Sequence, residues 1–165
     1  MLNLRKSAAP SFVTPQPFRL SDVYGYQPGN GHNQGRFPNQ KQILTDRHIL
    51  IVEDEAMIGF ALEMELDDIG AIPVGPATTL SGALQMLDQL PIDGAILDID
   101  LNGVDVYPLA DLLIDRGISF VFHTAHGKRK ELRDVYPGVP VCIKPVNTDD
   151  VLDALGNVFR DRSRN

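Results

Sequence analysis

The sequence predicts an α/β protein in which helices cover both faces of a parallel sheet. Short apolar runs alternate with longer segments whose apolar residues follow helical spacing. This alternation gives five strand–helix units over about 115 residues, and glycine or proline lies between many of the segments. Strands joined by helices form a parallel sheet, because right-handed crossovers place the helices on its two faces.

The first unit covers residues 48–70. Its strand, His48–Val52, is apolar and leads directly into the acidic residues 53–55. Gly70 suits the C-terminus of the helix that follows, because glycine readily adopts the left-handed conformation found there. The apolar residues that predict this helix are Ile58, Leu62, Leu66 and Ile69.

The second unit covers residues 71–91. Its strand contains Pro73, which indicates an edge position because proline cannot donate a hydrogen bond to a neighbouring strand. Either Thr78 or Thr79 can cap the helix, which ends before Pro91. The apolar stripe of this helix consists of Leu80, Leu84 and Leu87.

The third strand is predicted at residues 94–99. Its apolar run is bounded by Gly94 and by Asn102-Gly103, which is typical of a strand buried on both faces. Asp98 then lies at the carboxyl end of the strand, the edge at which α/β sheets bind ligands. Pro108 suits the first turn of the following helix.

The last two units follow the same pattern. Strands are predicted at residues 118–122 and 139–143, with a short polar helix at residues 128–136 between them. Asn147 or Thr148 caps the final helix.

Side chains that could bind a ligand or take part in a reaction follow four of these strands. Glu53 and Asp54 follow the first strand, Asp98 the third, Thr124 the fourth and Lys144 the fifth. Separations of 44, 26 and 20 residues match two, one and one strand–helix units. In a flavodoxin-like (βα)5 doubly wound parallel sheet of order 2-1-3-4-5 these strands are neighbours, so we expect the side chains to converge at one crevice.

This set of side chains has a consistent chemistry. Carboxylates held close together repel, so they need a cation or one of them must take up a proton. Oxygen ligands with room for water suit Mg²⁺. A threonine hydroxyl and a lysine ammonium beside them can bind an anion. A metal, an anion site and a carboxylate nucleophile together indicate phosphoryl transfer onto an aspartate.

At these positions the chain resembles a response-regulator receiver domain, the phosphorylatable module of two-component signalling. The resemblance covers residues 46–162. It is carried by four short motifs in order: Ile51-Val52-Glu53-Asp54-Glu55, Ala95-Ile96-Leu97-Asp98, Thr124-Ala125 and Lys144-Pro145.

The resemblance implies a role for each acidic residue. Asp98 would be the phosphoacceptor, with a histidine kinase or a histidine phosphotransfer protein as the donor. Asp54 and Asp98 would bind Mg²⁺ directly, Glu53 would act through water, and the backbone carbonyl of Asp100 would be a further ligand.

The resemblance also implies how a phosphoryl group would be held. Thr124 would hydrogen-bond a phosphoryl oxygen, and Lys144 would pair with the same group. The Lys144-Pro145 peptide bond is expected to be cis. The implied protein is a cytoplasmic single-domain response regulator, a bacterial signalling switch with only weak autocatalytic phosphotransfer and dephosphorylation, not an ordinary enzyme.

Two positions depart from the common receiver pattern. Asn102 stands where many receivers have proline. Val141 stands where many have an aromatic residue, so the usual coupling of threonine and aromatic ring cannot operate in the same way. Other segments resemble the alphaproteobacterial FATGUY-type stand-alone receivers, although Phe122-His123-Thr124-Ala125 replaces their Phe-Ala-Thr-Gly.

Two histidines flank Thr124. His123 and His126 could tune the site or bind metal, but without a third ligand a polar position at the rim is the favoured interpretation. His126 is a possible modulator of the site, and so is Val141, because it replaces the usual aromatic residue.

Two alternative functions remain open. A degenerate receiver would act only as a binding module, although the full set of site residues argues against this. A haloacid-dehalogenase-type phosphatase is suggested by Asp98-Ile99-Asp100, which resembles the Asp-x-Asp signature of that family. In that family the signature comes first and the acidic pair later, the reverse of the order here.

Composition sets the remaining limits. The chain has 165 residues, 43% of them apolar, and its single Cys142 cannot form an internal disulfide. No apolar run approaches the roughly 20 residues that cross a membrane. Residues 1–45 carry a net charge of +4 and residues 46–165 a net charge of −11. The acidic part argues against direct DNA binding, which depends on neutralising phosphates; output would pass to an unknown downstream protein.

Residues 1–45 are predicted to be a disordered or poorly ordered extension of the receiver domain at residues 46–162. The extension is rich in proline, glycine, asparagine and glutamine. Such a segment buries too little apolar surface to offset the entropy of ordering.

Overall fold

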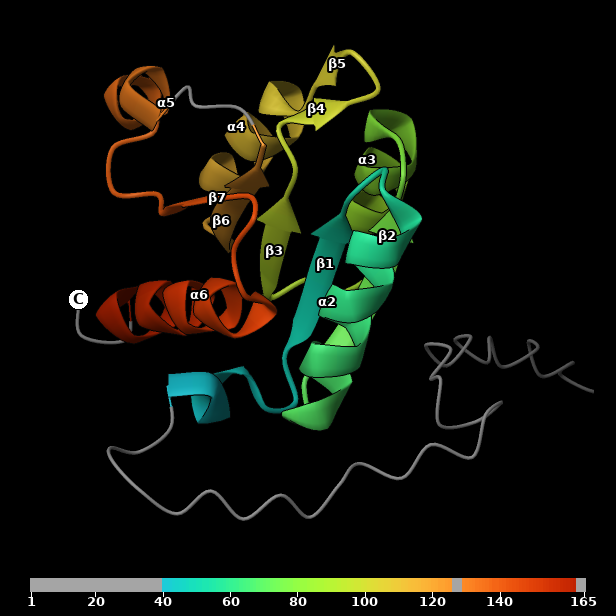
Figure 1. Cartoon of the computed structure of the whole chain (residues 1–165), viewed down its shortest axis with the longest axis vertical. Helices are drawn as coiled ribbons and strands as arrows, with labels where there is room; N and C mark the ends of the chain where they lie inside the picture. The colour runs from blue at the N-terminus through green and yellow to red at the C-terminus, as the bar shows by residue number, and fades with distance from the viewer. Residues whose placement is uncertain (1–39, 126–128, 163–165) are drawn as a thin grey trace, which may run out of the picture.

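The computed structural model describes residues 40–125 and 129–162, and it contains the predicted parallel sheet (Figure 1). The sheet strands are β1 (His48–Val52), β2 (Ile72–Ala77), β3 (Gly94–Leu97), β6 (Ser119–Thr124) and β7 (Val141–Ile143). They lie in the order β2-β1-β3-β6-β7, and every neighbouring pair is parallel. Counted along the chain, this is the order 2-1-3-4-5, so the flavodoxin-like (βα)5 fold is confirmed. The strand containing Pro73 lies at an edge, as predicted.

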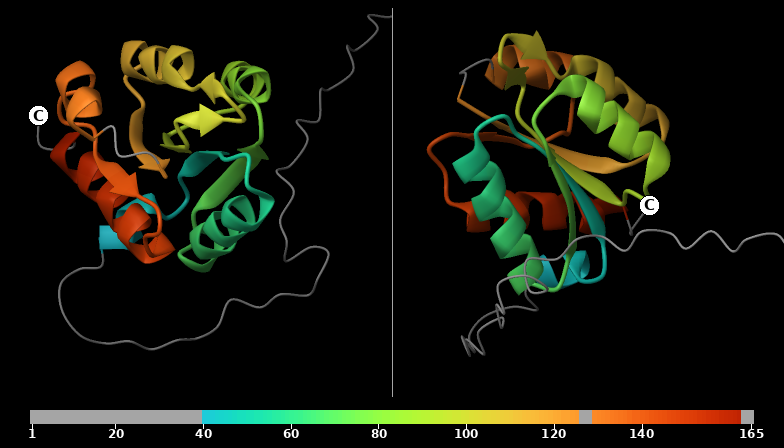
Figure 2. Two further views of the ribbon diagram at one scale, coloured as in Figure 1. Left: turned by 45° about the horizontal axis from the view of Figure 1, so that its top comes forward. Right: turned by 90° about the vertical axis from the view of Figure 1, so that its right-hand side faces the viewer.

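Helices cover both faces of the sheet (Figure 2). One face carries α2 (Ala56–Asp68) and α6 (Thr148–Arg162). The other carries α3 (Leu80–Gln89), α4 (Tyr107–Asp115) and α5 (Arg129–Val135). No helix in the described part of the chain is long and apolar enough to span a membrane.

The central strands supply apolar side chains to both faces. In β1, Ile49 and Ile51 join the core beneath α2 and α6, whereas Leu50 and Val52 join the core beneath α3 and α4. This follows from the period of two along a strand. All four residues of β3 are buried, which explains why its sequence is continuously apolar.

Two predicted strand ends shift at the carboxyl edge of the sheet, and the start of the fifth strand shifts as well. The strand predicted at residues 94–99 ends at Leu97, where the chain begins to turn away. The fourth strand runs on to Thr124 instead of ending at residue 122, because His123 and Thr124 pair with Cys142 and Ile143. The fifth strand begins at residue 141, not 139.

An unpredicted β-hairpin follows Asp98. Its strands are β4 (Asp100–Leu101) and β5 (Val104–Asp105), paired antiparallel. The turn between them is Asn102-Gly103, with φ angles of 55° and 87°. A type I′ turn needs positive φ at both central residues, and Asn-Gly is its preferred pair. The signal was therefore present in the sequence, where it was interpreted only as a strand boundary.

The described part of the chain includes structured residues before the predicted boundary at residue 46. Residues Gln40–Leu44 form a 3-10 helix, η1, and Leu44 is fully buried in the core beneath α2 and α6. This burial of a large apolar side chain corrects the boundary by several residues. Residues 1–39 and His126 lie outside the described residues.

The structure also identifies the cap of α3. The side-chain oxygen of Thr79 accepts a hydrogen bond from the backbone N–H of Gly82, at 3.1 Å. Thr79 therefore satisfies one of the free N–H groups at the start of the helix, and its neighbour Thr78 is exposed.

We expect Thr79→Ala to lower the free energy of unfolding by about 1 kcal/mol, because it removes this cap. Urea denaturation followed by circular dichroism measures the change. Thr78→Ala is the matched control and should stay within about 0.5 kcal/mol of the wild type. Equal losses in the two variants would contradict the assignment of the cap.

Candidate functional site

The predicted site residues lie at the carboxyl edge of the sheet. Glu53 and Asp98 directly follow β1 and β3, Thr124 is the last residue of β6, and Lys144 directly follows β7. Because β1, β3, β6 and β7 are adjacent and parallel, their ends meet at this edge. Glu53, Asp98 and Thr124 are buried although polar, so their surroundings must compensate for lost water.

Lys144 joins the two buried carboxylates. Its Nζ donates to Oδ2 of Asp98 at 2.6 Å and to Oε1 of Glu53 at 2.9 Å. Oε1 of Glu55 is 3.6 Å from the same nitrogen. The Lys144 side chain is only 10% exposed. A single ammonium group therefore compensates more than one buried negative charge.

Backbone N–H groups orient the carboxylates further. Glu55 donates to Oε1 of Glu53 at 3.3 Å, and Asp100 donates to Oδ1 of Asp98 at 3.3 Å. Asn102, in the hairpin turn, donates to Oδ2 of Asp54 at 3.1 Å. The unpredicted hairpin thus supplies a donor to one of the predicted metal ligands.

The site has the composition of a Mg²⁺ site. Glu53, Asp54 and Asp98 each offer a carboxylate oxygen, and these oxygens lie within 4.8 Å of one another. Next to them is a cavity of about 180 Å³, room for roughly six waters. Its lining consists of Asp54, Glu55, Asp98, Asp100, Asn102 and Ala125. Hard oxygen ligands, excess negative charge and space for water fit an ion that keeps part of its hydration.

Burial and charge displace the pKa values of the connected groups. Burial raises the pKa of Asp98, and Lys144 opposes this only in part. Burial also acts to raise the pKa of Glu53, but His123 and Lys144 outweigh it and the net pKa is lowered. Burial lowers the pKa of Lys144, but its bonds to Asp98 and Glu53 raise it overall. Lys144 is therefore held in its charged form.

Thr124 lies beside this group of residues. Its side chain is fully buried, and its carbonyl accepts the backbone N–H of Lys144 at 2.9 Å. The next residue, Ala125, lines the cavity. The Lys144-Pro145 bond is cis, as expected.

His123 does not occupy the polar rim position that was favoured for it. Only 3% of the residue is exposed, because it belongs to β6 and pairs with β7 on one side. Its Nδ1 lies 3.7 Å from Oε2 of Glu53. The strand predicted at residues 118–122 ends before His123, whereas β6 continues to Thr124, so its place in the sheet was not predicted.

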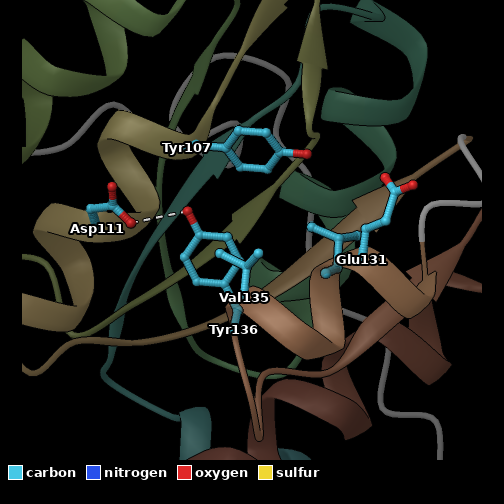
Figure 3. A pocket seen from close by; sticks show the side chains of 6 residues that line it. Tyr107, Asp111, Glu131, Val135 and Tyr136 are labelled. Carbon is cyan, nitrogen blue, oxygen red and sulfur yellow. Dashed lines mark hydrogen bonds between the residues drawn. The ribbon is translucent and has the colours of Figure 1, made fainter.

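Val141 has no aromatic ring, but rings from other positions lie near it. Val141 pairs with Phe122 across β6 and β7. The ring of Tyr136 lies 5.3 Å from that of Phe122 and 6.0 Å from that of Tyr107, between centroids. Figure 3 shows Tyr136, whose hydroxyl donates to Oδ1 of Asp111 at 3.0 Å, in the wall of a second cavity of about 470 Å³. This aromatic group had no recognised sequence signal, because its members come from separate elements.

Comparison with known proteins identifies relatives of the same architecture. No protein-family model matches the chain. The solution structure of SdrG from Sphingomonas melonis Fr1 is 38% identical, with a TM-score of 0.58, and the match covers 68% of this chain and 97% of that one. The response regulator PhyR from Brucella abortus is 24% identical, with a TM-score of 0.65, over 76% of this chain and 52% of that one.

Two further similar proteins come from other organisms. A CheY-like receiver domain protein from Methanospirillum hungatei JF-1 is 20% identical, with a TM-score of 0.62, over 72% of this chain and 97% of that one. The positive alginate biosynthesis regulatory protein of Pseudomonas aeruginosa is 28% identical over 117 residues, which are 68% of this chain. The chain spans only about half of that curated relative, 47% of its length.

The match to SdrG extends over nearly the whole of that protein, and the folds of PhyR and the CheY-like protein agree with the sheet order found here. With the acidic group at the carboxyl edge of the sheet, these similarities show that the chain belongs to the response-regulator receiver family, among relatives of PhyR and SdrG.

Proposed function

We propose that the chain is a phosphorylated switch in which Asp98 accepts a phosphoryl group from a histidine kinase or a histidine phosphotransfer protein. The observation that carries the proposal is the position of Asp98. It is a buried carboxylate that borders the 180 Å³ cavity, contacts an ammonium group and has an oxygen within 4.8 Å of oxygens of two further acids. Nothing in the packing of β3 requires an acid there.

The proposed reaction is a single transfer. A carboxylate oxygen of Asp98 attacks phosphorus, a P–O bond forms, and the P–N bond of the donor phosphohistidine breaks. The imidazole leaves with the electron pair of that bond and takes up a proton. The product is an acyl phosphate on Asp98.

The chain's other residues stabilise the charge of the transferred group. Asp54 and Asp98 would hold Mg²⁺, with the Asp100 carbonyl as a further ligand and Glu53 acting through water. The ion supplies positive charge to the phosphoryl oxygens when bound. Lys144 is already beside Asp98 and needs only a small movement to pair with the phosphoryl group. Thr124, next to the cavity-lining Ala125, would donate its hydroxyl proton to another oxygen.

A surface beside the site suits the donor protein. The donor histidine must reach Asp98, so the donor has to dock on residues that border the cavity. Glu55 lines that cavity, and α2 begins immediately after it with the exposed Met57 and Phe60, one helical turn apart. Apolar side chains at an exposed position next to the phosphoacceptor supply contact area for such a partner.

The proposed receiver covers residues 46–162 together with η1, whose Leu44 is buried in its core. The residues before η1 are the proposed extension, and the proposed location is the cytoplasm. The new charge of about −1.5 to −2 on the phosphorylated residue would change protein contacts at this edge of the sheet. The partner would be a downstream protein or a further phosphotransfer protein. Direct DNA binding is not expected, because residues 46–165 carry a net charge of −11.

Incubation with acetyl phosphate and Mg²⁺ should add one phosphoryl group to the wild-type chain, measured by intact mass. Asp98→Asn should give no adduct because the nucleophile is gone. Asp54→Ala should give about tenfold less adduct than the wild type because a metal ligand is lost. The surface variant Asp115→Asn is the control and should behave like the wild type. A wild-type chain that binds Mg²⁺ but forms no adduct would indicate a binding module. Rapid turnover of phosphate esters would indicate a phosphatase.

Mg²⁺ should stabilise the folded chain, because the carboxylates come together only when the sheet forms. At a concentration of 100 times its Kd, the ion should add about 2.7 kcal/mol to the free energy of unfolding. Thermal denaturation with Mg²⁺ or with EDTA measures this. Asp54→Ala should lose most of the gain and Asp115→Ala should keep it. A gain of equal size in both variants would contradict binding at this site.

Two variants should change the metal-free stability in opposite directions. The raised pKa of Asp98 means that, above the ordinary value of 3.8, the folded chain holds a proton that the unfolded chain has lost. Stability therefore falls as pH rises through this window, and Asp98→Asn should be more stable than the wild type at neutral pH. The pKa of Glu53 is lowered below 4.5, so its ionised form stabilises the fold and Glu53→Gln should be less stable.

Urea denaturation in EDTA, at neutral pH and at about pH 4, tests both signs. The difference in the free energy of unfolding between each variant and the wild type should shrink at the lower pH. Asp98 is protonated there in the wild type, and Glu53 begins to be protonated. Destabilisation by Asp98→Asn at neutral pH would show that its bond to Lys144 outweighs the cost of its buried charge.

A further inference from the structure

Two buried atoms face each other without a hydrogen bond between them. Among the described residues, Oε2 of Glu53 and Nδ1 of His123 are the buried side-chain atoms without a hydrogen-bond partner. They lie 3.7 Å apart, and their side chains are 1% and 4% exposed. A buried polar atom left without a hydrogen bond destabilises the fold, so two such atoms at this distance have a strong reason to pair.

Lys144 does not fully satisfy Glu53. Its Nζ is 2.9 Å from Oε2, but as an ion-pair contact without hydrogen-bond geometry. The same nitrogen donates to Oε1 of Glu53 and, more closely, to Asp98. The second oxygen of Glu53 therefore has room for a donor of its own.

We propose that His123 is a positioning residue for Glu53, donating its Nδ1–H to Oε2 and so fixing a carboxylate that would take part in holding Mg²⁺. A carboxylate can only accept, so the proton must lie on Nδ1. This holds for the neutral ring with its proton on that nitrogen and for the charged ring alike. A movement of about 1 Å closes the gap to the usual distance of such a bond.

The inference rests on the proposed function, because it concerns the same metal site. Glu53 is proposed to reach the ion through water, so its orientation sets where that water is held. Partners that orient groups around a metal typically change its affinity 10- to 100-fold when they are removed. His123 acts through Glu53 and does not itself bind the ion, in keeping with the three-carboxylate group found here.

The location of His123 explains how such a role can arise in one chain of a family. It lies in β6 next to Thr124, and its backbone pairs with Cys142, two residues before Lys144. Thr124, its neighbour along β6, belongs to the proposed phosphoryl-binding set, and Lys144 lies two residues beyond its partner in β7.

Isothermal titration calorimetry of the full chain with Mg²⁺, which measures the Kd of the ion, tests the proposal. His123→Leu, which keeps the approximate volume but has no donor, should raise the Kd about tenfold. His123→Asn carries an N–H₂ group near the position of Nδ1 and should restore the affinity to within about threefold of the wild type. Thermal unfolding in EDTA checks that each variant is folded.

His48→Leu is the matched control. Nδ1 of His48 also faces a carboxylate, Oδ2 of Asp93 at 3.4 Å, but at the opposite edge of the sheet. This variant should leave the Kd for Mg²⁺ unchanged. A folded His123→Leu chain with the wild-type Kd would overturn the proposal, and so would equal losses in the leucine and asparagine variants, which would indicate a packing role.

The result is separable from the phosphorylation experiment, because Mg²⁺ affinity is measured without a phosphodonor. If the wild-type chain forms the Asp98 adduct and His123→Leu has the wild-type Kd for Mg²⁺, only the role of His123 is rejected. A wild-type chain that binds no Mg²⁺ rejects the metal site and the role of His123 together.

Discussion

The contact between Lys144 and the buried carboxylates is the constraint on which the site depends. One ammonium group lies between Asp98 and Glu53, whose charges would otherwise be buried close together. These three residues come from the ends of three strands far apart in sequence, so only the order β1-β3-β6-β7 brings them into contact. The remaining negative charge, together with Asp54, is the physical basis for proposing a divalent cation there.

The hairpin after Asp98 changes how one common receiver position is used. Asn102, where many receivers have proline, has positive φ and forms a tight turn with Gly103. Proline could adopt neither that φ nor the hydrogen bond, because it lacks an N–H, and the N–H of Asn102 binds Asp54. The departure from the family pattern thus supplies a donor beside the proposed metal ligands instead of weakening the site.

The absence of an aromatic residue at Val141 is accompanied by aromatic packing from other positions. Tyr136, Phe122 and Tyr107 lie within ring-contact distance on the same side of the sheet, and Phe122 precedes Thr124 by two residues in β6. Any movement of Thr124 on phosphorylation would therefore act on a strand that is packed against these rings. The modulating role predicted for Val141 remains a prediction, as does that of His126.

Apolar periodicity and the spacing of strand–helix units are local properties of the chain, so they predicted the fold class and the residues that follow each strand. The strand order was predicted from the order that flavodoxin-like sheets share. Side-chain contacts depend on how distant segments pack, so they could be seen only in the folded chain. The structure showed that Thr79 and not Thr78 caps α3, that Leu44 is in the core, and that His123 faces Glu53. The position of His123 depends on how far β6 extends, which is determined by its pairing with β7 and not by the residues of β6.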